Sequence, residues 1–117
     1  MPDRREPGIS THVLDTERGE PAAGVTVRLA RWDGEVLAPL AGAETDPDGR
    51  IASLAPAPLR VGRYQLSFDV AAYFLARGGP PPFLSRVSID FEIADPRRHY
   101  HVPLLVSRFA CSSYRGS

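Results

Sequence analysis

Prolines and glycines recur along the whole chain, and their spacing is the strongest constraint on its fold. Twelve prolines and ten glycines divide the 117 residues into short segments. Proline removes a backbone donor and fixes φ, and glycine weakens the interior of a helix or strand. No stretch is therefore left in which a long helix can form, and we expect short elements joined by tight turns.

Between these breaks, residues alternate with the period of two that is typical of strands. In the segment 9–15, ISTHVLD, one face is made of Ile9, Thr11 and Val13. The opposite face carries Ser10, His12 and Leu14. The same alternation runs through the segments 25–31, 63–70, 86–93 and 99–106. Pro103 interrupts the last of them, which indicates an edge, a bulge or the end of pairing there.

Turn signals separate these segments at the spacing of a sandwich. Asp33-Gly34 is a hairpin signal, and TDPDGR, residues 45–50, is a second turn cluster. The Ala-rich segment 71–79 is the one plausible helix, and it ends at Gly78-Gly79. We therefore predict a single domain over residues 1–117: an all-β sandwich of two antiparallel sheets, with seven to eight short strands and one short helix.

The three histidines stand out among the polar residues. His99 and His101 are two apart, so they share one strand face, and His12 lies in the middle of another strand. A lone strand histidine is often only a structural polar residue, and a His-x-His pair is also compatible with a metal site. No carboxylate or cysteine stands at a familiar ligand spacing, and the single Cys111 has no activating neighbour.

Composition and missing motifs exclude several classes of function. The 14 basic and 14 acidic side chains give a formal net charge of zero, so no global field attracts nucleic acid or an anionic membrane. The chain has no nucleotide-binding glycine fingerprint and no G-x-S-x-G nucleophile motif. Without an apolar leader, an apolar run of membrane-spanning length or a Ser-Lys-Leu end, we expect a cytoplasmic protein.

Several motifs, in order, resemble one known family. The blocks ISTHVLDTERGEPAAGVTVRL, TDPDGR, HYHVPLL and the closing YRGS are similar to those of 5-hydroxyisourate hydrolases, transthyretin-related enzymes of urate breakdown. The resemblance covers nearly the whole chain, and YRGS separates the enzymes from transthyretin itself. The chain departs from the family pattern before the tail, at Ala110-Cys111, and near the segment PPFLSRVSI. Neither departure touches a position with a catalytic counterpart.

The resemblance implies a site made of distant residues. It assigns catalysis to His12, Arg50 and His101, and places His101 rather than His99 at the position of the family's second histidine. The same residues, together with the tail residues Tyr114, Arg115 and Ser117, are expected to bind substrate. The carboxylate of Ser117 is a hypothetical orienting group. The resemblance also implies a homotetramer, a dimer of dimers, with the sites between dimers.

The reaction that this resemblance implies is the opening of the cyclic amide of 5-hydroxyisourate, a small-molecule substrate, to 2-oxo-4-hydroxy-4-carboxy-5-ureidoimidazoline. Two imidazoles suit this reaction because they titrate near neutrality and can divide the roles of base and acid, with no metal or cofactor. The order of those roles cannot be read from the sequence. The alternatives are a transthyretin-like carrier of small ligands, which would lack the His/Arg set and the YRGS tail, an adhesive or carbohydrate-binding sandwich, and a site in which the histidines hold zinc.

Overall fold

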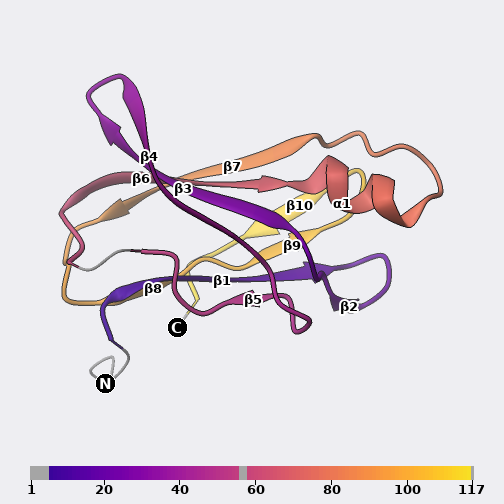
Figure 1. Cartoon of the computed structure of the whole chain (residues 1–117), viewed down its shortest axis with the longest axis horizontal. Helices are drawn as coiled ribbons and strands as arrows, with labels where there is room; N and C mark the ends of the chain where they lie inside the picture. The colour runs from indigo at the N-terminus through magenta and orange to yellow at the C-terminus, as the bar shows by residue number, and fades with distance from the viewer. Residues whose placement is uncertain (1–5, 56–57, 117) are drawn as a thin grey trace.

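Two packed sheets form the protein in the computed structural model, which describes residues 6–55 and 58–116 (Figure 1). The first sheet is built on β1 (Gly8–Asp15), with β2 (Glu20–Pro21) and β5 (Arg50–Ile51) antiparallel to it and β8 (His99–His101) and β9 (Leu104–Val106) parallel to it. The strand β10 (Cys111–Ser113) pairs with β9 at one edge. The second sheet has the order β4 (Val36–Glu44), β3 (Thr26–Asp33), β6 (Gly62–Asp69) and β7 (Arg86–Ile93).

The hydrophobic core lies between the two sheets. Ile9 and Val13 of β1, Leu29 of β3 and Leu66 and Phe68 of β6 have no exposed surface. These are positions of period-two alternation, so each strand turns one apolar face inward and leaves the other outside. Burial of side chains of this size contributes about 1.5–3 kcal/mol each, which makes the shared interior the main source of stability.

The helix α1 (Val70–Arg77) closes one end of the sandwich. The Asp69 side chain accepts a hydrogen bond from the N–H of Ala72, which starts the helix, and Gly78, at φ 73°, ends it. The sequence pattern predicted the start of the helix one residue late, because Val70 continues the apolar alternation of the preceding strand. Val70 is in fact the first helical residue, and it is buried.

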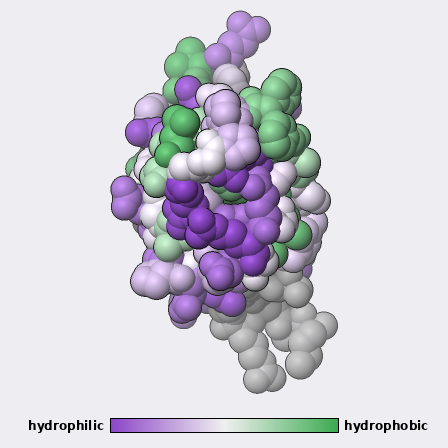
Figure 2. All heavy atoms as spheres, turned by 90° about the vertical axis from the view of Figure 1, so that its right-hand side faces the viewer, coloured by the Kyte–Doolittle hydropathy of each residue, from purple (hydrophilic) through white to green (hydrophobic). Residues whose placement is uncertain are grey.

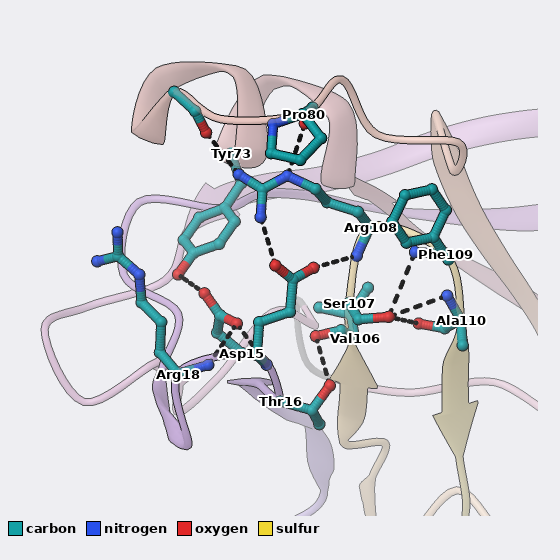
Figure 3. Close-up of polar contacts among 12 residues, drawn as sticks. Asp15, Thr16, Arg18, Tyr73, Pro80, Val106, Ser107, Arg108, Phe109 and Ala110 are labelled. Carbon is teal, nitrogen blue, oxygen red and sulfur yellow. Dashed lines mark hydrogen bonds and ion pairs between the residues drawn. The ribbon is translucent and has the colours of Figure 1, made fainter.

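A polar network holds this end together, and we call its residues Asp15, Glu17, Tyr73 and Arg108 the α1-end network. Figure 3 labels Asp15, Tyr73 and Arg108 within it. Arg108 bonds Glu17 and donates to the carbonyl oxygens of Gly78 and Pro80 at 2.6 and 2.7 Å. The Tyr73 hydroxyl donates to Asp15 at 2.8 Å. On the surface of this end, hydrophilic side chains gather at the centre and hydrophobic ones lie beside them (Figure 2).

The predicted sandwich with one short helix is confirmed, but the strand count of seven to eight was low. The prediction of two antiparallel sheets was also wrong for the first sheet, which is mixed because β8 and β9 run parallel to β1. Ten strands occur over the described residues. The segment 99–106 is split into β8 and β9 at the buried Pro103, as its proline suggested, and the two-residue strands β2 and β5 are too short for a periodic signal. The Asp33-Gly34 hairpin is confirmed, with a positive φ at Gly34.

No helix in residues 6–55 and 58–116 has the length and apolar character needed to cross a membrane.

Candidate active site

The middle of β1 brings three distant segments onto one surface. His12 faces Arg50 of β5 across an antiparallel pair, and Ser10 faces His101 of β8 across a parallel pair. Paired residues project to the same side of a sheet, and so do residues two apart along a strand. His12, Arg50 and His101 therefore share the face opposite the core. We call the residues Ser10, His12, Arg50, His99 and His101 the histidine face.

The turn before β5 fixes the place of Arg50. One carboxylate oxygen of Asp46 accepts the N–H groups of Asp48 and Arg50, each at 2.9 Å. The carbonyl oxygen of Gly49 accepts the N–H of Val13 at 2.8 Å. Gly49 has φ +76°, and a Cβ there would stand 2.5 Å from the Val13 carbonyl oxygen. Only glycine permits this approach, so the Asp-Gly-Arg turn docks on β1 and delivers Arg50 beside His12.

His99 and His101 project to the same side of β8, as their spacing predicted. Both reach the Ser10 hydroxyl oxygen, with 2.7 Å to His99 Nε2 and 2.8 Å to His101 Nδ1. The other ring nitrogen of His99, Nδ1, lies 3.0 Å from the main-chain oxygen of Glu6. His99 is buried with 9% of its surface exposed, whereas His101 is half-buried. His99 is thus committed to contacts within the chain.

The C-terminal segment returns to His101 through its main chain. Gly116 and His101 form an isolated antiparallel bridge, and the Gly116 N–H donates to the His101 carbonyl oxygen at 2.8 Å. A Cβ on Gly116 would stand only 2.5 Å from Cδ2 of the His101 ring. The glycine of the tail therefore allows close packing against this imidazole, and Gly116 lies beside the histidine face.

The two side chains before Gly116 point elsewhere within the chain. Tyr114 and Arg115 line a cavity of about 280 Å³ together with Ile89, Phe91 and Tyr100, and neither histidine nor Arg50 of the proposed site lines it. The Arg115 guanidinium lies 4.8 Å from the centre of the Tyr100 ring. Ser117 lies outside the described residues. The structure thus brings His12, Arg50 and His101 together but not the side chains of Tyr114 and Arg115.

The reactive groups of the histidine face differ in how they are held. His12 is half-buried and Arg50 is exposed, and over residues 6–55 and 58–116 neither side chain makes a hydrogen bond or ion pair. Their donors and acceptors remain available to a bound molecule. No group of three or more His, Cys, Asp or Glu able to hold a metal ion occurs in the described part of the chain.

Sequence reasoning missed the part that Ser10 takes in this site. The period-two alternation predicted that Ser10 lies on the face of His12, which is confirmed. Its contact with His99 and His101 depends on β8 lying parallel to β1. Ser10 and His101 are separated by 91 positions, and no local pattern encodes that pairing. Asp15 and Asp46 act as turn residues, since both accept main-chain N–H groups that follow them.

Comparison with known proteins finds relatives over nearly the whole chain. The model of the HIUase/Transthyretin family matches residues 9–116. A 5-hydroxyisourate hydrolase of Caulobacter vibrioides is 50% identical over 113 residues, covering 94% of this chain and 98% of the relative. A 5-hydroxyisourate hydrolase of Deinococcus radiodurans is 45% identical over 115 residues, covering 95% and 97%.

Solved structures with the same fold include both a hydrolase and transthyretins. The 5-hydroxyisourate hydrolase of Klebsiella pneumoniae has a TM-score of 0.80 and 46% identity, covering 93% of this chain and 98% of its own. Transthyretin from Sparus aurata has a TM-score of 0.86 but only 28% identity, covering 96% and 97%. The shape is therefore common to the two groups, and the sequence is markedly nearer to the hydrolases.

Proposed function

This chain belongs to the HIUase/transthyretin family, and from that membership we propose that it is a 5-hydroxyisourate hydrolase whose active site is the histidine face. The substrate is a small molecule, 5-hydroxyisourate, and the reaction opens its cyclic amide to 2-oxo-4-hydroxy-4-carboxy-5-ureidoimidazoline in urate degradation. The protein needs no cofactor for this reaction. We assign a cytoplasmic location, which fractionation of the native cells would test.

The observation that carries the proposal is the register of β1. His12 against Arg50 and Ser10 against His101 bring two imidazoles and a guanidinium to one outer face from three strands. Ser10 and His12 are separated by about 7 Å, two steps of a strand. A bicyclic substrate of comparable size can therefore contact His12, Arg50 and His101 at once.

The chemistry required is addition of water to an amide carbonyl and protonation of the leaving nitrogen. One imidazole of the pair His12 and His101 takes a proton from water as the oxygen attacks the carbonyl carbon. The other donates a proton to the ring nitrogen as the carbon–nitrogen bond breaks. Such acid–base assistance contributes roughly 10²–10⁴-fold in rate. Neither a metal nor a covalent nucleophile takes part, so exhaustive chelation should leave the rate unchanged.

Arg50 has a distinct role in this proposal. Its planar guanidinium offers several N–H donors in a fixed arrangement, which suits ring carbonyls and the negative charge that develops on the attacked oxygen. Its exposed side chain is free to close over a substrate held against His12. Tyr114, Arg115 and Ser117 remain predicted substrate-binding residues, and the tail residue shown to pack on His101 is Gly116.

We assign a homotetramer, a dimer of dimers with the active sites between dimers. The histidine face is one side of a sheet, with His12 half-buried and Arg50 exposed, so a single chain supplies one wall of a site and leaves the other open. A second copy facing it would enclose the substrate. Light scattering of the pure protein tests this assembly, and a mass of one chain only would contradict it.

A carrier of small ligands is the alternative function, since transthyretin from Sparus aurata shares the fold with a TM-score of 0.86. A carrier would bind a ligand and release it unchanged. The available donors and acceptors of His12 and Arg50, and the identity of 50% with a hydrolase, favour turnover.

The decisive experiment generates 5-hydroxyisourate from urate with urate oxidase and follows its ultraviolet absorbance after the protein is added. We expect decay far faster than in buffer, and His12→Ala and His101→Ala each to slow it by orders of magnitude. The variant Arg28→Ala, an exposed residue of the other sheet, is the control and should keep full activity. Decay at the buffer rate with the wild-type tetramer would overturn the hydrolase assignment.

A further inference from the structure

A hydrogen-bonded chain runs from Glu6 to His101 through groups that the mechanism above does not use. The Glu6 main-chain oxygen lies 3.0 Å from His99 Nδ1, and His99 Nε2 lies 2.7 Å from the Ser10 hydroxyl oxygen. The same hydroxyl oxygen lies 2.8 Å from His101 Nδ1. Ser10 and His99 are 7% and 9% exposed, so water competes little with these contacts.

Counting donors and acceptors fixes which group donates in each hydrogen bond of this series. A carbonyl oxygen only accepts, so His99 Nδ1 must carry a hydrogen and donate it to Glu6. In a neutral imidazole the second nitrogen is then an acceptor, and the Ser10 hydroxyl donates its single hydrogen to His99 Nε2. Ser10 has only lone pairs left for His101. His101 Nδ1 must therefore carry a hydrogen and donate it to Ser10.

We propose that Ser10 and His99 are positioning residues that hold His101 as its Nδ1–H tautomer. The basic lone pair of His101 is then on Nε2, which is the nitrogen that exchanges a proton with water or the leaving group. The hydrogen-bonded series also orients the His101 ring, because Nδ1 is hydrogen-bonded to a buried hydroxyl. A catalytic imidazole commonly has its tautomer set by the partner of its other nitrogen.

The proposal explains why His99 and His101 differ although they share a strand face. Both ring nitrogens of His99 are used within the chain, by Glu6 and Ser10, so His99 has none left for substrate. A metal held between the two rings would have to displace the Ser10 hydroxyl, which already lies within hydrogen-bond distance of both. His99 thus acts through Ser10 and not on the substrate.

The first test is spectroscopic and needs no activity. Side-chain ¹⁵N NMR of the full-length protein at about pH 8, above the ordinary imidazole pKa of about 6.5, separates protonated from unprotonated ring nitrogens. We expect His101 to show a protonated Nδ1 and an unprotonated Nε2, and Ser10→Ala to shift the ring toward the Nε2–H form. A wild-type His101 with its hydrogen on Nε2, or a Ser10→Ala spectrum with an unchanged tautomer, would overturn the inference.

The second test is kinetic and rests on the proposed hydrolase function. Ser10→Ala should lower kcat about 10- to 100-fold, within the range of acid–base catalysis, with little change in KM. Ser10→Thr, which keeps the hydroxyl, should restore most of the rate. His99→Leu should lower kcat as Ser10→Ala does, whereas His99→Gln keeps an oxygen acceptor for Ser10 and should lose less.

The matched control is Thr11→Val. Thr11 is the neighbour of Ser10 on the core side of β1 and is 1% exposed. Its hydroxyl donates a hydrogen bond of 2.6 Å to the carbonyl oxygen of Val102, the residue that follows β8. Equal losses of kcat in Thr11→Val and Ser10→Ala would indicate general loosening and would overturn the positioning role. An inactive wild type with the expected tautomer would refute the hydrolase function alone, and an active wild type with the other tautomer would refute this inference alone.

Discussion

Polar side chains gather at the middle of β1 and at its C-terminal end, and the two groups differ in how completely the chain itself uses them. In the α1-end network, both carboxylate oxygens of Asp15 are occupied, one by the Tyr73 hydroxyl and one by the N–H groups of Glu17 and Arg18. Arg108 bonds Glu17 and two main-chain carbonyls. On the histidine face, His12 and Arg50 make no side-chain hydrogen bond over residues 6–55 and 58–116.

This difference distinguishes polar residues that stabilise the fold from polar residues that are available for function, although both kinds lie on one strand. A polar group whose donors and acceptors are all used inside the chain stabilises the fold, and its removal leaves a buried partner unsatisfied. A polar group with unused capacity stabilises nothing locally, and it is available to a ligand. We therefore expect substitutions at the α1-end network to change the free energy of unfolding, and substitutions of His12 and Arg50 to change the rate.

The largest expected effect is loss of rate at Arg50. Arg50→Met keeps the length of the side chain but removes the donors for a developing oxyanion, so kcat/KM should fall about 10²–10³-fold, or about 2.7–4 kcal/mol of transition-state stabilisation. The free energy of unfolding should stay within about 0.5 kcal/mol, because the side chain is exposed. Arg28→Met, on the other sheet, is the control. A large loss of stability without loss of rate would reverse the comparison.

Next in size is loss of stability at Asp15. Asp15 is 1% exposed, and Asp15→Ala leaves the Tyr73 hydroxyl and two N–H groups without acceptors, which should cost about 2–3 kcal/mol in urea unfolding. The rate per folded molecule should not change. Glu44→Ala, an exposed carboxylate on β4, should change neither quantity. If Asp15→Ala lowered kcat while leaving stability intact, the α1-end network would belong to the catalytic machinery.

The sequence predicted those parts of the comparison that depend on local pattern. Alternation in 9–15 separated Ile9 and Val13, which are in the core, from His12 on the opposite face. The Asp-Pro-Asp-Gly sequence predicted the turn that carries Arg50. These features follow from backbone geometry over a few residues, so a single sequence is sufficient to read them.

Contacts between distant segments could not be read in the same way. The parallel pairing of β1 with β8 joins residues about ninety positions apart, and it decides that Ser10 rather than a nearer hydroxyl meets His101. The family resemblance placed Tyr114 and Arg115 in the tail, but it could not say toward which cavity their side chains turn. Tertiary packing sets that direction, and within this chain it favours the cavity beside Tyr100.

A smaller effect is expected where the tail meets the histidine face. A Cβ at Gly116 would stand 2.5 Å from the His101 ring, so Gly116→Ala should displace the imidazole and lower kcat about 10-fold, equivalent to about 1.4 kcal/mol. Stability should change little, because the residue ends an isolated bridge. Gly42→Ala is the control, since a Cβ there meets its nearest atom at an ordinary 3.5 Å. Unchanged kinetics in Gly116→Ala would mean that the tail does not constrain His101.

The smallest expected effect is an alkaline loss of stability from the α1-end network. Burial, together with the hydrogen bond to Asp15, raises the pKa of Tyr73 from 10.0 to about 12. The folded state therefore retains the phenol proton longer than the unfolded state, so this contribution is complete below pH 10 and is lost as pH rises toward 12. Between pH 9 and pH 11 the wild type should lose about 1 kcal/mol more than Tyr73→Phe. Equal slopes for the two proteins in urea unfolding would show that the Tyr73–Asp15 contact does not hold the proton, and the contrast between the two regions of β1 would then rest on Arg108 and Glu17 alone.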